Sequence, residues 1–158
     1  MLDGLLATSP LLGIAGAILG ATLLLLAWVD IKTGLLPDAL TLSLMWVGLL
    51  FNLDGLIAPL RSAVLGAAAG YLLLWAANRA HRWAIGRDGM GYGDFKLTAA
   101  LGAWFGVALL PWIVLGACIA GWGAAMARRR AGRADRPLPF GPSLAAAGLA
   151  ALGVVFSR

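Results

Sequence analysis

The sequence predicts an all-α integral membrane protein, a bundle of about six transmembrane helices with both termini on the non-cytoplasmic side. Three observations support this prediction: the composition, the length of the apolar blocks and the placement of the basic residues. Of the 158 residues, 61% are hydrophobic and only 12% are charged. These are too few polar side chains to cover a water-soluble domain, so lipid is the expected surroundings of the chain.

Apolar blocks define the expected helices in order. The first is long enough to cross a bilayer, with Thr22 as its only polar side chain. The fourth has 33 residues and would be about 50 Å long as one helix, against a hydrocarbon core of roughly 30 Å. It is therefore expected to fold back near Gly106 and Pro111. The blocks span residues 11–29, 39–51, 62–77, 95–127 and 139–156.

Basic residues give the expected orientation. In a six-helix arrangement the loops after the first, third and fifth helices share one side, and ten of the twelve lysines and arginines fall in or beside those loops. The positive-inside rule makes that side cytoplasmic and explains the net charge of +5 without nucleic-acid binding. The ten are Lys32, Arg79, Arg82, Arg87, Lys96, Arg128, Arg129, Arg130, Arg133 and Arg136.

Glycines four residues apart are expected to pack helices closely. Small residues on one helix face let backbones approach and gain van der Waals contacts that lipid does not match. We interpret these pairs as packing features of a compact bundle. They are Gly16 with Gly20, Gly66 with Gly70, and Gly102 with Gly106.

Asp30 is the first candidate for chemistry. It ends the first apolar block, where a carboxylate is costly unless it faces protein or a water-filled cavity. A purely structural role as a helix terminator is the alternative. That role is weaker, because a negative charge at a helix C-terminus opposes the helix dipole.

Asp94 is the second candidate. It follows a glycine-rich stretch, residues 89–93, and precedes an apolar helix. Aspartate is a favoured N-cap, so the local pattern leaves capping and catalysis equally open. The two roles are compatible, since a helix start can present its carboxylate to a cavity.

Two further aspartates could support such a site. Asp38 follows Pro37 and is expected to be the N-cap of the second helix. Asp88 lies beside Arg87. An ion pair in solvent is the ordinary interpretation of this pair, and contact with a substrate is the functional alternative.

A pair of carboxylates can carry acid–base chemistry. Two aspartates from different helices can share one proton, so that one activates water and the other assists the leaving group. The sequence does not assign the two roles. With one cysteine and one histidine in the chain, we expect no metal site and no cofactor.

The motifs resemble those of the type IV prepilin peptidases, the membrane GxGD aspartyl peptidases. The resemblance extends over nearly the whole length, in the expected order. It rests on Asp30 with Pro37-Asp38, on Gly91-Tyr92-Gly93-Asp94-Phe95-Lys96, and on Leu138-Pro139-Phe140-Gly141-Pro142.

The resemblance implies a single membrane peptidase domain over residues 1–158, with Asp30 and Asp94 as the catalytic pair. Gly91, Gly93, Lys96, Asp38 and Asp88 are then expected as substrate-binding or supporting residues. It also implies removal of the basic leader from prepilins or pilin-like secretion proteins at the cytoplasmic face of the inner membrane. No N-methyltransferase activity is expected, because nothing matches the N-terminal region of larger relatives.

Two other functions remain open from the residues alone. A catalytically silent assembly subunit would use the aspartates only as helix caps. A small transporter would explain intramembrane carboxylates and glycine-broken helices, although no internal repeat is visible.

Overall fold

The structure, a computed structural model, describes residues 2–87, 89–132 and 139–157, the first eight of these by their backbone alone. This part of the chain is helical and contains no strand, which confirms the all-α prediction. The helices are α1 (Leu2–Thr33), α2 (Asp38–Phe51), α3 (Leu60–Ile85), α4 (Tyr92–Arg130) and α5 (Gly141–Phe156).

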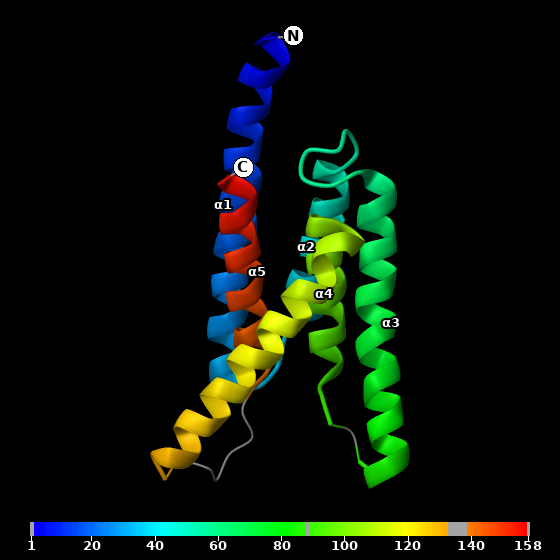
Figure 1. Cartoon of the computed structure of the whole chain (residues 1–158), viewed down its shortest axis with the longest axis vertical. Helices are drawn as coiled ribbons and strands as arrows, with labels where there is room; N and C mark the ends of the chain where they lie inside the picture. The colour runs from blue at the N-terminus through cyan, green and yellow to red at the C-terminus, as the bar shows by residue number, and fades with distance from the viewer. Residues whose placement is uncertain (1, 88, 133–138, 158) are drawn as a thin grey trace.

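Helix α4 is the centre of the bundle. It packs against α3, α2 and α5, and α5 in turn packs along α1 (Figure 1). The start of α1 and the end of α5 lie towards one end of the molecule. The loops that follow α1 and α3, together with the end of α4, lie towards the other end, which we call the loop end.

The backbone of α4 is broken at Gly106. This glycine has φ 76° and ψ 171°, a conformation that side chains make costly. The two limbs of α4, residues 92–105 and 107–130, run in opposite directions (Figure 1). The long apolar block thus folds back at Gly106 as expected, whereas Pro111 lies inside the second limb.

Buried polar side chains satisfy the backbone groups that the break leaves without helical partners. The Asn52 side-chain amide donates to the carbonyl oxygens of Ala103 and Trp104, both at 2.9 Å. Its carbonyl oxygen accepts from the N–H groups of Ile57 and Ala58 at 3.0 Å. Asn52 is fully buried, and its four hydrogen bonds connect the first limb of α4 to the loop before α3.

Helices α3 and α4 meet backbone to backbone at glycines. A Cβ on Gly102 would collide with the carbonyl oxygen of Gly66, and a Cβ on Gly70 would lie 2.7 Å from the carbonyl oxygen of Thr98. The expected close packing is therefore present here. Gly16 and Gly20 on α1 instead receive side chains of α5, among them Phe156 and Leu149.

The outer surface of the helices is apolar, as expected of helices that contact lipid. Among the described residues, three helices are long and apolar enough to cross a membrane: α1 from Pro10 to Thr33, α3 and α4. Helices α2 and α5 are shorter, with 14 and 16 residues, and are also apolar. Large apolar side chains point away from the core along these helices, including Leu24, Val64, Leu115 and Ile119. The number of crossings stays a prediction.

Candidate active site

Asp30 lies inside α1, one turn before its end. The helix continues through Lys32 to Thr33, so Asp30 does not take the role of helix terminator, the weaker of the two alternatives left by the sequence. Its side chain points inward and is only 5% exposed. One carboxylate oxygen, Oδ2, is buried and has no hydrogen-bond partner among the described residues. Asp30 therefore faces protein, which avoids the free-energy cost of exposing a carboxylate to lipid.

Asp94 lies in the first turn of α4. The N-cap of that helix is Gly91, so the capping role considered for Asp94 is not the one it takes. Asp94 is the third helical residue, and its carboxylate faces the backbone of Gly91, the position that a carboxylate takes in a capping box. Asp94 is only 8% exposed, and its own carbonyl oxygen accepts a bond from the Thr98 hydroxyl at 2.8 Å.

The two aspartates line one cavity of about 1040 Å³ at the loop end. They are close enough for the charge on Asp30 to act on Asp94. Three segments far apart in the sequence form the walls: residues 30–36 with Asp38, residues 89–94 with Lys96, and Pro139 with Phe140. A cavity of this size exceeds what a single small molecule needs and can admit a short stretch of extended peptide.

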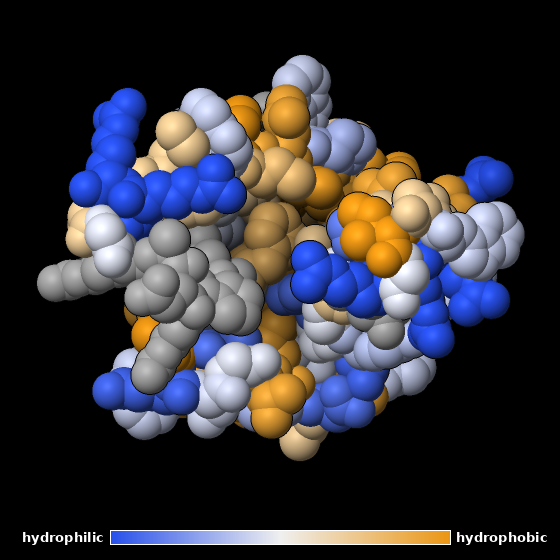
Figure 2. Space-filling view, turned by 90° about the horizontal axis from the view of Figure 1, so that it is seen from below, coloured by the Kyte–Doolittle hydropathy of each residue, from blue (hydrophilic) through white to orange (hydrophobic). Residues whose placement is uncertain are grey.

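Hydrophilic residues surround the loop end. Figure 2 looks onto this end and shows them gathered around a central hollow with hydrophobic residues inside. Basic side chains of α3 belong to this end, where the Arg79 guanidinium lies 5.8 Å from the centre of the Trp83 ring. A charged rim around an apolar interior suits a substrate with one polar and one apolar part.

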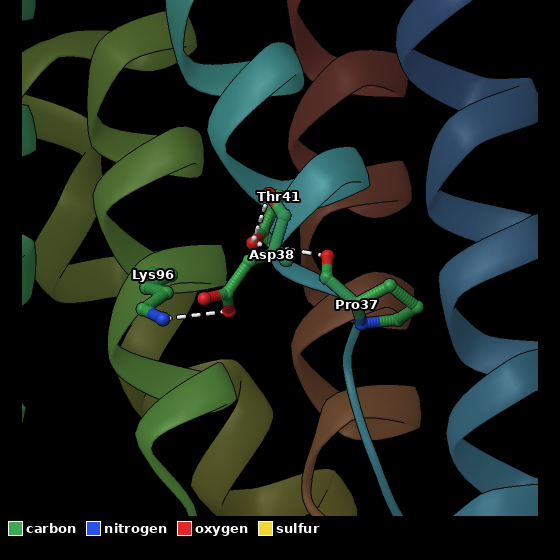
Figure 3. Close-up of polar contacts among 4 residues, drawn as sticks. All are labelled: Pro37, Asp38, Thr41 and Lys96. Carbon is green, nitrogen blue, oxygen red and sulfur yellow. Dashed lines mark hydrogen bonds and ion pairs between the residues drawn. The ribbon is translucent and has the colours of Figure 1, made fainter.

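Asp38 and Lys96 form an ion pair at the cavity. The Asp38 carboxylate lies 2.6 Å from the Lys96 ammonium group and thereby joins the start of α2 to the first limb of α4 (Figure 3). The prediction that Asp38 caps α2 is wrong, because Pro37 is the N-cap and makes no side-chain bond. The Thr41 hydroxyl bonds to the carbonyl oxygen of Pro37 at 3.3 Å (Figure 3).

The other predicted supporting residues have different roles. A Cβ on Gly91 would lie 4.0 Å from Oδ2 of Asp94, an ordinary contact, whereas a Cβ on Gly93 would lie 2.7 Å from the Cβ of Leu36. Asp88 lies outside the described residues. Leu36 was missed from the sequence, since an apolar residue in a loop gives no signal of its packing.

The arrangement can activate water between two carboxylates without a metal ion. Among the described residues, no group of three His, Cys, Asp or Glu side chains lies together in a way that could hold a metal ion. Two buried carboxylates in one cavity repel each other when both are charged, and sharing one proton relieves that repulsion. Such a pair has both the base and the acid that hydrolysis of an amide requires.

Comparisons with known proteins identify a family and several relatives. Residues 17–126 match the model of the type IV leader peptidase family. Curated relatives named prepilin leader peptidase/N-methyltransferase include one from Pectobacterium carotovorum, 52% identical over 84% of this chain and 48% of the relative. Another, from Dickeya chrysanthemi, is 48% identical over 99% of this chain and 56% of the relative.

The chain spans about half the length of the curated relatives that it matches. No solved structure is significantly similar to it. The family match covers most of the chain, including α2, α3 and both candidate aspartates. The chain belongs to the type IV leader peptidase family.

Proposed function

We propose that the chain is a membrane aspartyl endopeptidase that removes the leader peptide from prepilins or pilin-like secretion proteins. Asp30 and Asp94 are its catalytic pair, and the cut is made at the cytoplasmic face of the inner membrane. One observation carries the proposal: two nearly buried aspartates, 64 positions apart in the sequence, line one cavity at the loop end.

The proposed reaction needs only these carboxylates and water. The ionised aspartate takes a proton from water as the water oxygen attacks the scissile carbonyl carbon. The protonated aspartate donates to the carbonyl oxygen, which gives a neutral tetrahedral diol. The aspartate that took the proton from water then gives it to the peptide nitrogen as the C–N bond breaks, while the other aspartate takes a proton from a diol hydroxyl; the products are a carboxylic acid and a free amine, and the pair again holds one proton. The pair acts as one titrating unit.

The orientation follows from charge. Lys32, Arg82 and Lys96 belong to the loop end, and the positive-inside rule places such residues in the cytoplasm. With the two limbs of α4 counted separately, about six segments would cross or enter the membrane. The cavity then opens at the cytoplasmic surface, where the leader of a prepilin meets the apolar helix that follows it; the basic residues of this end do not themselves account for binding of a basic leader.

The test is leader removal from a purified prepilin by the full chain in lipid vesicles. Asp30→Asn and Asp94→Asn each keep the side-chain shape and remove the ionisable group, so each is expected to lower kcat by at least about 1000-fold. Asp54→Asn is the matched control, because Asp54 is exposed in the loop between α2 and α3. Normal cleavage by either of the first two variants would refute the assignment of the pair, whereas no cleavage by the unaltered chain would favour a silent assembly subunit.

The absence of methyl transfer remains a separate prediction. The relatives' name includes an N-methyltransferase, whereas the two carboxylates of the cavity are proposed here to carry out hydrolysis. Mass analysis of the cleaved pilin, with a methyl donor present, is expected to show a free amino terminus. A methylated product formed by this chain alone would contradict that prediction without affecting the peptidase.

A further inference from the structure

The start of α5 touches Asp30 through a glycine. A Cβ on Gly141 would collide with Oδ2 of the Asp30 carboxylate. Every residue other than glycine carries that atom, so only glycine fits here while Asp30 keeps its present position. The contact joins α1 to α5 directly below the cavity that Asp30 lines with Asp94.

The hydrogen bonds at the start of α5 point to the same contact. The first N–H groups of a helix lack partners in the helix and need an acceptor elsewhere. Pro142 has no N–H group, while Ser143 and Leu144 both donate to the carbonyl oxygen of Phe140, at 3.0 and 3.1 Å. The helix has no side-chain N-cap, and the backbone of Gly141 lies against the Asp30 carboxylate, so that its N–H group faces that carboxylate.

The Asp30 carboxylate has few contacts that fix its orientation. Its Oδ2 atom is buried without a hydrogen-bond partner, and no described residue other than Gly141 offers a donor to the carboxylate. A buried carboxylate is normally held by several bonds, which fix its orientation. In this protein the orientation of Asp30 depends on the backbone at position 141, which carries no side chain.

We propose that Gly141 is a positioning residue of the peptidase, holding the Asp30 carboxylate against the start of α5 so that it shares the cavity with Asp94. This inference rests on the proposed function of the pair. Gly141 acts through Asp30 and touches no reacting atom itself. A methyl group at this position has to displace the carboxylate by a distance on the order of 1 Å, and a misplacement of that size can cost about 100-fold in rate.

The experiment compares two alanine variants of α5 in the full chain. Gly141→Ala places a methyl group against Asp30, whereas Gly153→Ala lies in the same helix with nothing within 4 Å of the added atom. For Gly141→Ala we expect kcat to fall between 10- and 100-fold, with KM within about twofold of the original chain. Gly153→Ala is expected to cleave normally. Equal kcat for both variants, or a change confined to KM, would overturn the proposal.

Thermal unfolding of the same variants in a second background separates positioning from simple loss of fold. Asp30→Ala removes the carboxylate and leaves only Leu36, whose Cδ1 would lie 3.3 Å from the new atom, so adding Gly141→Ala is expected to lower Tm clearly less in this background than when Asp30 is present. An equal loss of Tm in both backgrounds would place the collision elsewhere and overturn the inference. This comparison needs no activity, so it decides the contact even if the chain cleaves no prepilin and the proposed function fails.

Discussion

Replacing Asn52 with alanine tests how the bundle holds the helix that carries Asp94. Asn52 makes four hydrogen bonds, two donated to carbonyl oxygens at the end of the first limb of α4 and two accepted from the loop before α3. A typical internal hydrogen bond contributes about 1 kcal/mol net, so four of them amount to about 4 kcal/mol. Alanine leaves these buried groups without partners, and we expect the free energy of unfolding to fall by about 3–5 kcal/mol.

The assay is equilibrium unfolding of the full chain in mixed micelles, followed by circular dichroism. Thr22→Ala is the control, because the Thr22 hydroxyl bonds only to the carbonyl of Ile18 in its own helix, at 2.8 Å. That variant is expected to stay within about 0.5 kcal/mol of the original chain. A loss below about 1 kcal/mol for Asn52→Ala would refute the view that Asn52 stabilises the break at Gly106.

Two further predictions concern contacts between α4 and its neighbours. Breaking the Asp38–Lys96 ion pair with Lys96→Met should lower the free energy of unfolding by less than about 1 kcal/mol, because both side chains reach solvent. A double-mutant cycle with Asp38→Asn measures the coupling energy of the pair, and a coupling above about 2 kcal/mol would contradict this. Gly102→Ala should lower the free energy of unfolding by about 1–3 kcal/mol, because the new atom meets the backbone of Gly66. Gly116→Ala is the control, since its new atom meets only the Ala147 side chain, at 3.7 Å. Equal unfolding free energies for the two variants would refute the backbone contact.

Local patterns were sufficient for most of the fold. The apolar block at residues 39–51 became α2 almost residue for residue, and the fold-back of the fourth block occurs at Gly106. In both places the signal lies in the sequence itself, as hydropathy or as the backbone freedom of glycine. Asp38 was predicted wrongly, because a favourable local cap competed with a distant partner, Lys96, that the local sequence does not show.

Residues whose partners lie far along the chain were beyond sequence reasoning. Asn52 looked like an interruption of an apolar block, yet its partners are more than 50 positions away and its side chain is fully buried. Gly141 was noted only as part of a motif, since its contact with Asp30 depends on how α1 and α5 pack. Asp30 became a candidate because of the membrane cost of its carboxylate, and the family resemblance decided in favour of Asp94, which local sequence left open; the cavity that both line required the three-dimensional structure.

The most direct test of a shared active site is the kcat of leader removal for Asp30→Asn, Asp94→Asn and the double variant, measured on one prepilin in the same vesicles. If the two carboxylates share one proton and act as a unit, removing both costs no more than removing either one, and the three residual rates agree within about tenfold. If the losses instead multiply, so that the double variant is slower by the product of the two single effects, the aspartates act independently and the account of a single catalytic pair is wrong.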